Sequence, residues 1–231
     1  VAEGVSAGYH GHPIVHDLNL TVSAGKVVVL LGPNGAGKTT TLLTLAGDLP
    51  ALKGEIFIDG KATTSPLYSR AKNGLSFVTE ERSVFMRLTV SENLRVGRGD
   101  TERALELFPE LRPLLRRRAG LLSGGEQQML SLARALARTP KILLIDELSL
   151  GLAPLVVIRR LDAVRAAARE YGVGVLLVEQ HVKQALRVAD EVLVMQRGTI
   201  VLEGPTEAVR GRLGDLEAAY LSAGPAAPEQ E

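Results

Sequence analysis

The sequence predicts an α/β fold built on a mainly parallel sheet, and two observations support this prediction. Runs such as Val27–Leu31 and Ile142–Ile145 are apolar throughout, which is typical of strands that are covered on both faces. In the second half of the chain these runs alternate with segments of helical periodicity. Alternation of strand and helix is the pattern of a parallel α/β sheet.

The first 79 residues have the texture of strands. Turns are expected at Gly8–Tyr9 and at Ser23–Lys26, because glycine and small polar residues interrupt the pattern there. A buried strand is expected at Val27–Leu31, and another at Glu55–Ile58 that ends in the turn signal Asp59–Gly60.

From about Arg82 to Gly120 the strand runs disappear, and Leu, Arg and Glu recur. This change predicts a small helical insert. A helix is expected after Gly125, because apolar residues repeat there at helical spacing, and Thr139-Pro140 should end it.

The remaining elements follow the alternating order. After the apolar strand Ile142–Ile145 we expect a helix at about Leu155–Tyr171, a strand at Val173–Val178 and a short helix at Val182–Val188. A hairpin of Val192–Gln196 and Thr199–Glu203 should close the fold.

Composition narrows the class of protein. The chain of 231 residues has no cysteine, which excludes disulfides and thiolate-bound metals, and its formal net charge is only +1. No apolar run reaches the about 20 residues that a membrane helix needs. The amino terminus, with Glu3 among its first residues, does not resemble a signal peptide. We therefore expect a cytosolic protein. Its net charge gives no overall positive potential that would attract nucleic acid.

The strongest motif follows the strand Val27–Leu31. Residues Gly32-Pro33-Asn34-Gly35-Ala36-Gly37-Lys38-Thr39 match G-x-x-x-x-G-K-[ST], and Thr40–Ala46 can continue as a helix. Glycines let successive backbone N–H groups turn toward one anion, while Lys38 and the helix start add positive charge. The Thr39 hydroxyl is placed to bind Mg²⁺. This loop predicts a site for a nucleoside triphosphate.

Two acids, Asp146 and Glu147, end the strand Ile142–Ile145. Ligands of open α/β sheets bind at the carboxyl ends of the strands. Successive strand side chains point to opposite faces, so the two carboxylates should have different tasks. Asp146 is the candidate for holding Mg²⁺ through water, and Glu147 for deprotonating a water that attacks the γ-phosphate.

The segment Leu122–Gln128 opens the helix that follows the insert. Ser123 and Glu126 fit the capping-box pattern S-x-x-E, so a well-formed helix start explains them by itself. The alternative is a second anion site, since glycines expose N–H groups at a helix N-terminus.

Taken in order, the loop Gly32–Thr39, the segment Leu122–Gln128, the acids Asp146–Glu147 and a histidine after the next strand resemble an ATP-binding cassette (ABC) ATPase. The resemblance implies a P-loop NTPase core with a mainly parallel sheet, an N-terminal antiparallel β subdomain and a helical subdomain inserted at about 82–124. It also implies one domain over residues 1–222. Residues 223–231 should be a disordered tail, because they are small, Pro-containing and acidic.

The resemblance further implies a head-to-tail dimer that binds ATP and Mg²⁺. In each half-site ATP would contact Tyr9, Gly32, Pro33, Asn34, Gly35, Ala36, Gly37, Lys38, Thr39 and Thr40, and in trans Ser123, Gly124, Gly125 and Glu126 of the second chain. Thr39, Glu80 and Asp146 would be the residues of the Mg²⁺ site. Glu147 and His181 would be catalytic, and His181 would contact the γ-phosphate.

The segments Phe77–Phe85, Leu88–Leu94 and Ser149–Pro154 are similar to the shorter ATPase of branched-chain amino-acid importers. Most cassettes have Gln in place of Glu80, but this branch commonly has Glu. Leu148 departs from the family, which usually has Pro after the catalytic Glu. If the loss of proline only relaxes the backbone of Glu147, Leu148→Pro should fold normally and hydrolyse ATP as fast or a few-fold faster. The alternative is that Leu148 packs against a neighbouring helix.

The expected function is therefore the ATP-hydrolysing subunit of an importer, most simply one for branched-chain amino acids. Its partners would be a second ATPase subunit, identical or not, integral membrane permease subunits and, indirectly, an extracytoplasmic solute-binding protein. It would lie peripherally on the cytoplasmic face of the membrane. Urea or amide importers use similar ATPases, and a soluble cassette protein is the alternative of another class.

The basic run Arg116–Arg118 fits a solvated face or a membrane contact.

Overall fold

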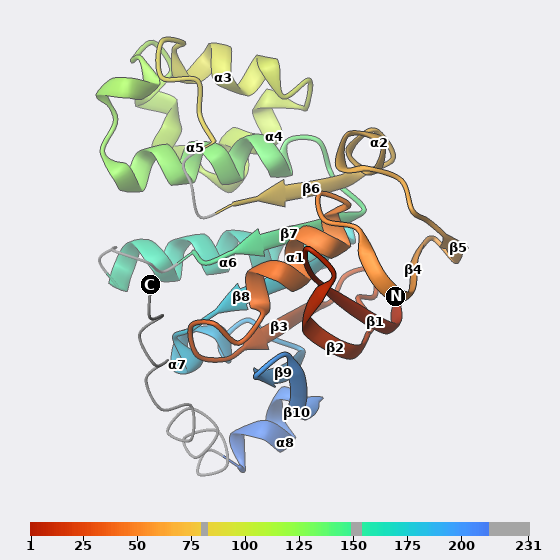
Figure 1. The fold of residues 1–231 in the computed structure, drawn as a ribbon. Coiled ribbons are helices and arrows are strands. Elements are labelled where there is room, and N and C mark those ends of the chain that lie inside the picture. The colour runs from red at the N-terminus through yellow and green to blue at the C-terminus, as the bar shows by residue number, and fades with distance from the viewer. Residues whose placement is uncertain (80–82, 149–153, 213–231) are drawn as a thin grey trace, which may run out of the picture.

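A six-stranded sheet forms the centre of the molecule (Figure 1). The computed structural model describes residues 1–79, 83–148 and 154–212. In spatial order the strands are β10 (Thr199–Pro205), β9 (Glu191–Gln196), β3 (Val27–Leu31), β8 (Gly174–Glu179), β7 (Ile142–Asp146) and β6 (Leu75–Val78). All neighbouring pairs are parallel except β9 and β10. The predicted parallel sheet and the closing hairpin are confirmed.

The carboxyl ends of three central strands meet at one edge of this sheet. Leu31 at the end of β3 is in register with Glu179 at the end of β8. Asp146 at the end of β7 is in register with Val178. The segments that follow these strands therefore begin side by side, although they are far apart in the sequence.

The sheet is buried on both faces, which explains its unbroken apolar strands. In β3, Val27, Val29 and Leu31 belong to one hydrophobic core, while Val28 and Leu30 belong to a second. The first core also contains side chains of helices α5 (Gly124–Leu136), α6 (Pro154–Tyr171) and α7 (Val182–Ala185). Helix α1 (Lys38–Ala46) and the strands at the start of the chain pack on the other face.

A four-stranded antiparallel sheet precedes this core in the sequence. Its order is β2 (His12–Leu20), β1 (Ala2–Tyr9), β4 (Ala51–Ile58) and β5 (Lys61–Ala62). A short helix, α2 (Leu67–Lys72), then leads to β6. The sequence indicated only strands over this stretch, so α2 was missed, and β4 begins four residues before the strand expected from Glu55.

The turn expected at Gly8–Tyr9 is wrong. Both residues lie in β1, opposite Pro13 and His12, and the turn falls at His10 and Gly11, which both have positive φ. Such a pair is typical of a tight hairpin turn. Gly8 is needed for a close approach instead, since a Cβ there would lie 1.9 Å from the carbonyl oxygen of His12.

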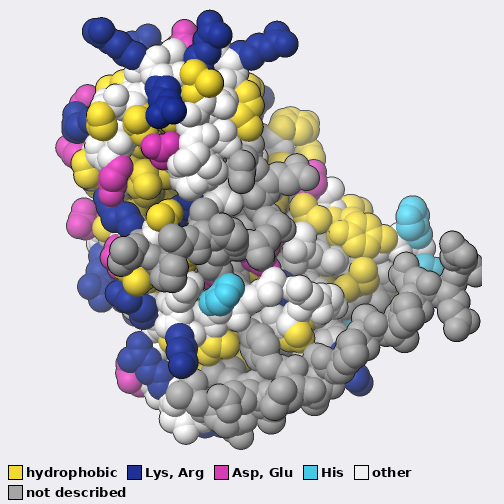
Figure 2. All heavy atoms as spheres, turned by 90° about the vertical axis from the view of Figure 1, so that its left-hand side faces the viewer, with side chains coloured by type: hydrophobic (Ala, Val, Ile, Leu, Met, Phe, Trp, Pro, Cys, Tyr) yellow, Lys and Arg dark blue, Asp and Glu magenta, His cyan; other side chains and the backbone are white. Residues whose placement is uncertain are grey.

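The segment between β6 and β7 is helical, as expected. It contains α3 (Val90–Val96), α4 (Thr101–Leu107), the 3₁₀ turns Pro109–Leu114 and Ala119–Leu121, and then α5. Figure 1 shows α3, α4 and α5 together at one end of the molecule, beyond β6. Figure 2 shows Lys and Arg side chains projecting at the same end, and Arg116–Arg118 are exposed, as on a solvated face. Nowhere in the three described ranges is there a helix with the length and apolarity to cross a membrane.

An ion pair at the amino edge of the sheet holds three elements together. The carboxylate of Asp190 accepts hydrogen bonds from the Val27 amide (2.9 Å) and from Nη2 of Arg165 in α6 (2.9 Å). Lys26 adds a weaker contact at 3.9 Å. The hydrogen bonds from Arg165 and Val27 outweigh partial burial and lower the pKa of Asp190.

Asp190→Asn should destabilise the fold by about 1.5–3 kcal/mol at pH 7, the usual value of hydrogen bonds to a charged group. Because the folded pKa lies below the unfolded value of about 3.9, the ion pair contributes fully above that pH and loses its contribution as the pH falls through the folded pKa. Urea unfolding should therefore show a difference at pH 7 that shrinks below about pH 3.9. The exposed Asp162 of α6 provides the control Asp162→Asn. An equal loss for Asp190→Asn at both pH values would contradict the ion-pair account.

Candidate functional site

The glycine-rich loop lies between β3 and α1, as the motif requires. Gly37 caps the start of α1 with φ 105°, a left-handed conformation that a side chain rarely adopts. Lys38 is 6% exposed. Its Nζ donates hydrogen bonds to the carbonyl oxygens of Gly32 (2.8 Å) and Pro33 (2.9 Å). The loop thus encloses one buried ammonium group at the carboxyl end of the sheet.

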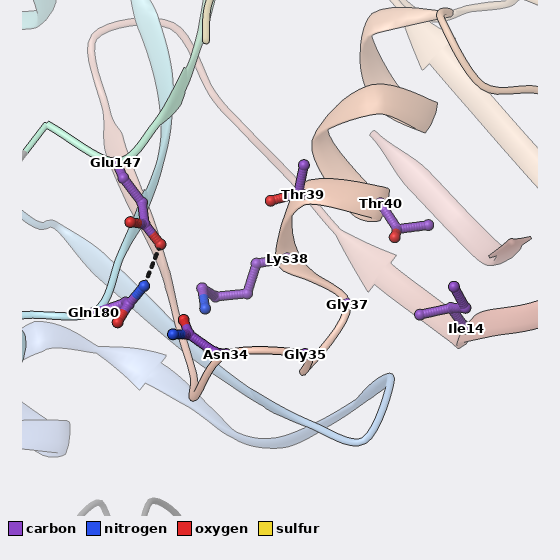
Figure 3. A pocket seen from close by; sticks show the side chains of 9 residues that line it. All are labelled: Ile14, Asn34, Gly35, Gly37, Lys38, Thr39, Thr40, Glu147 and Gln180. Atoms are coloured by element: carbon purple, nitrogen blue, oxygen red, sulfur yellow. Dashed lines mark hydrogen bonds between the residues drawn. The ribbon is translucent and has the colours of Figure 1, made fainter. Parts of the chain in front are cut away.

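A cavity of about 470 Å³ opens over this loop (Figure 3). This volume lies within the range of about 300–1,000 Å³ that is usual for ligand pockets. The cavity is lined by Ile14, Asn34, Gly35, Gly37, Lys38, Thr39, Thr40, Glu147 and Gln180. In Figure 3 the loop and the start of α1 form one wall, and Glu147 and Gln180 lie across from Lys38.

The two carboxylates predicted at the end of β7 do occupy different places. Asp146 is the last residue of the strand and is 5% exposed. Glu147 has left the strand with φ 47°, and its amide donates to the carbonyl of Val178 (3.1 Å). Strand alternation was therefore the wrong reason: the left-handed backbone of Glu147 turns its side chain into the cavity. Such conformations cost energy and are concentrated at functional sites.

Gln180 is a site residue that the sequence analysis missed. Its Nε2 donates to Oε1 of Glu147 at 2.6 Å, and this contact is drawn in Figure 3. The only available signal was its position directly after β8, next to His181. Ile14, which lies in β2 at the other side of the cavity, left no signal in the sequence.

Burial lowers the pKa of Lys38, although the carboxylates of Glu147, Asp146 and Glu179 act in the opposite direction. A buried cation, backbone N–H groups at a helix start and a threonine hydroxyl together suit a bound phosphate chain. Mg²⁺ that is bound with a nucleotide takes one or two protein ligands plus phosphate oxygens and water, which Thr39 and Asp146 can supply. Among the described residues, no three His, Cys, Asp or Glu side chains gather into a metal site.

Tyr9 and His181, which were also predicted for the site, do not line this cavity. Tyr9, at the end of β1, is 43% exposed. His181 is exposed at the start of α7. Glu80 lies outside the described residues. Their predicted contacts with ATP, γ-phosphate and metal remain predictions.

Ser123, Gly124, Gly125 and Glu126 lie together at the start of α5, away from the cavity of the same chain. Ser123 and Glu126 form a complete capping box: the Ser123 amide donates to Oε2 of Glu126 (2.7 Å), and the Glu126 amide donates to Oγ of Ser123 (3.3 Å). The helix-start interpretation of this segment is confirmed, and a role in trans remains a prediction.

Leu148 is 3% exposed within the larger core. Its amide donates to Oε1 of Glu179 (2.9 Å), a residue that is completely buried. Proline has no N–H, so a family-like Pro at this position would leave that carboxylate oxygen without this donor. These contacts favour the packing alternative over a simple loss of backbone restraint.

Leu148→Pro is therefore expected to destabilise the chain by about 2–5 kcal/mol, through lost packing and the lost hydrogen bond. Thermal unfolding measures the effect. Leu148→Met keeps both the N–H and most of the volume, and should cost less than about 1.5 kcal/mol. Parent-like stability and activity of Leu148→Pro would restore the restraint interpretation.

The loop, the buried lysine and the facing carboxylate at the edge of a parallel sheet define a P-loop nucleoside triphosphatase. The chain belongs to the ABC transporter family, whose model, described as "ABC transporter", matches residues 15–149.

Two curated relatives and one solved structure illustrate the similarity. The chain is 43% identical over 208 residues to the high-affinity branched-chain amino acid transport ATP-binding protein BraG of Pseudomonas aeruginosa, covering 86% of this chain and 89% of that protein. It is 38% identical over 219 residues to the lipopolysaccharide export system ATP-binding protein LptB of Escherichia coli, covering 89% and 90%. A nucleotide-free ATP-binding cassette from an ABC transporter superposes with a TM-score of 0.86 over 96% of this chain and 98% of that one, at 24% identity. This last likeness supports the fold.

Proposed function

We propose that the chain is the ATP-hydrolysing subunit of an ABC importer for branched-chain amino acids. The observation that carries the proposal is the cavity over the phosphate loop, in which Lys38 faces the Glu147–Gln180 pair (Figure 3). The 43% identity to BraG supports the choice of solute.

Residues that line the cavity, and Asp146 next to Glu147 in the chain, have proposed tasks. Lys38 and the loop amides bind the β- and γ-phosphates, and Thr39 with Asp146 holds Mg²⁺, which neutralises charge on the phosphates when bound. Glu147 accepts a proton from the attacking water, and Gln180 holds its carboxylate in place through the 2.6 Å hydrogen bond. Glu80 is assigned to the metal, Tyr9 to the adenine and His181 to the γ-phosphate by the family resemblance.

The proposed working unit is a head-to-tail dimer of cassettes on the cytoplasmic face of the membrane. In it the start of α5 of one chain closes over the cavity of the other, so that ATP connects the two. The helical region at about 82–124 passes this closure to permease subunits, and an extracytoplasmic solute-binding protein delivers the solute. Residues 1–222 act as one domain in this proposal.

Export of lipopolysaccharide is the second candidate, because LptB is 38% identical over a similar share of the chain. The cavity does not separate the two, since the membrane subunits select the transported molecule. Import of urea or amides is a third use of the same ATPase design.

The first test is Mg²⁺-dependent release of phosphate from ATP by the purified chain, with Lys38→Ala as the inactive control. The second is ATP-driven uptake of leucine by vesicles that contain the chain with the permease subunits that co-purify with it. Absence of ATP hydrolysis would overturn the enzymatic proposal. Uptake of urea or an amide, or co-purification with lipopolysaccharide-export subunits, would overturn the choice of solute.

A further inference from the structure

A buried arginine connects two parts of the molecule that the proposed mechanism keeps separate. Arg160 in α6 is 0% exposed and is among the largest fully buried side chains. Its Nη1 donates to Oε1 of Gln128 (2.6 Å) and to the carbonyl oxygen of Leu148 (3.1 Å). Its Nη2 donates to the carbonyl oxygen of Gly125 (2.8 Å). One guanidinium thus joins the start of α5 to the backbone that follows Glu147.

The connection continues from Leu148 to the cavity. The Leu148 amide donates to Oε1 of Glu179 (2.9 Å), and the amide of Gln180 donates to Oε2 of the same carboxylate (3.3 Å). Gln180 in turn donates to Glu147 at 2.6 Å. Hydrogen bonds therefore run without a gap from the first turns of α5, through Arg160, to the carboxylate that faces Lys38.

A contribution to the stability of the fold does not explain why an arginine is buried at this position. Among the described residues, no carboxylate forms an ion pair with Arg160; its three acceptors are a side-chain amide and two backbone carbonyls. Burial lowers the pKa of Arg160 to about 10, so it is still a cation at neutral pH. Its buried Nε has no hydrogen-bond partner in the part of the chain that the structure describes. A buried charge of this kind costs desolvation energy, and an apolar side chain of similar volume is often as stable or more so.

We propose that Arg160 is a positioning residue that links the start of α5 to Glu147, so that placement of the α5 start on the partner's nucleotide fixes the backbone of the catalytic carboxylate in its own chain. The planar guanidinium suits this role because its fork reaches Gly125 and Leu148 together. Leu148 supplies both the carbonyl that Arg160 binds and the N–H that Glu179 binds. A proline there would break the second contact. The proposal rests on the proposed ATPase function.

The test compares ATP hydrolysis and nucleotide binding in the chain of residues 1–231. Arg160→Met keeps the apolar volume but removes the link, and should lower kcat about tenfold, since misplacement of catalytic groups by an ångström costs up to about a hundredfold. KM and the Kd for ATP should change less than threefold (~0.7 kcal/mol). Arg160→Lys, which keeps the charge without the fork, should lie between Arg160→Met and the parent.

Arg159→Met is the matched control. Arg159 precedes Arg160 in the same helix, but its guanidinium binds Glu110 (2.6 Å) and the carbonyl oxygen of Leu107 (2.6 Å). It contacts neither α5 nor Leu148 in these hydrogen bonds, so its kcat should equal that of the parent. Gln128→Leu removes one acceptor on α5. Combined with Arg160→Met it should lower kcat no further than Arg160→Met alone, because both act through the same link.

The stoichiometry of ATP binding, measured by calorimetry, separates positioning from a structural role. If Arg160 only stabilises the fold, stoichiometry and kcat should fall together; the proposal expects full stoichiometry with reduced kcat. If Arg160→Met shows no cooperative unfolding, Arg160→Lys carries the test, and a parent-like kcat there overturns the proposal. A parent-like kcat of Arg160→Met overturns it while the ATPase function stands. Absence of hydrolysis by the parent chain overturns both.

Discussion

Glu147→Gln is expected to leave ATP bound to the chain but to stop most of its hydrolysis. The side chain faces the cavity from a left-handed backbone at φ 47° and accepts a hydrogen bond from Gln180. A glutamine carbonyl can accept the same hydrogen bond, so the local geometry should persist. The amide cannot take a proton from water, however, and general-base catalysis typically contributes about 10²–10⁴ in rate. A loss of that size in kcat is the expected result.

Binding of ATP should survive or tighten in the same variant. Glu147 is the leading carboxylate of those that act on the buried Lys38, and its negative charge also opposes the phosphates. With the charge removed and hydrolysis blocked, ATP should hold two chains together, and size-exclusion chromatography should show an ATP-dependent dimer.

Glu106→Gln is the matched control, because Glu106 is an exposed acid in α4. It should hydrolyse ATP at the parent rate and form no trapped dimer. Steady-state hydrolysis close to the parent rate in Glu147→Gln would remove Glu147 from the role of base.

The phosphate loop was predictable because its signals are local. A buried strand, a run of glycines and a lysine at the start of a helix lie next to one another in the sequence, and the structure has β3, the loop and α1 in that order. The same holds for the capping box of Ser123 and Glu126. Burial of β3 on both faces was likewise predictable, because every residue of this strand is apolar and successive side chains enter the two cores in turn.

The residues that the sequence did not indicate depend on contacts between distant segments. Gln180 meets Glu147 only because β7 and β8 are neighbours in parallel register. Arg160 looks in the sequence like one more charge on an amphipathic helix, yet it is fully buried where α6 meets both α5 and Leu148, two residues beyond β7. Gly8 resembled a turn glycine, since a close approach to His12 on a paired strand leaves no local signal.

Two inactive chains should restore nucleotide-dependent dimerisation when they are mixed. Lys38→Ala removes the buried ammonium of the loop and leaves the start of α5 intact, whereas Ser123→Arg does the reverse. If each nucleotide lies between the loop of one chain and the α5 start of the other, every site in either homodimer carries one defect. A mixed dimer concentrates both defects in one site and leaves the second site complete. When all chains also carry Glu147→Gln, so that the ATP is not hydrolysed, ATP should then produce a dimer on a sizing column only in the mixture.

Folding of the two variants sets the conditions of this experiment. Ser123 is exposed, so the arginine has room, but loss of the cap should cost about 0.5–2 kcal/mol, and the mixing is best done well below the melting temperature. The matched control mixes Lys38→Ala with a chain that carries both substitutions, because no complete site can form from that pair. If the chain with Glu147→Gln alone dimerises with ATP under the same conditions and the first mixture does not, Ser123 acts only as the cap of its own helix, and the trans role is wrong.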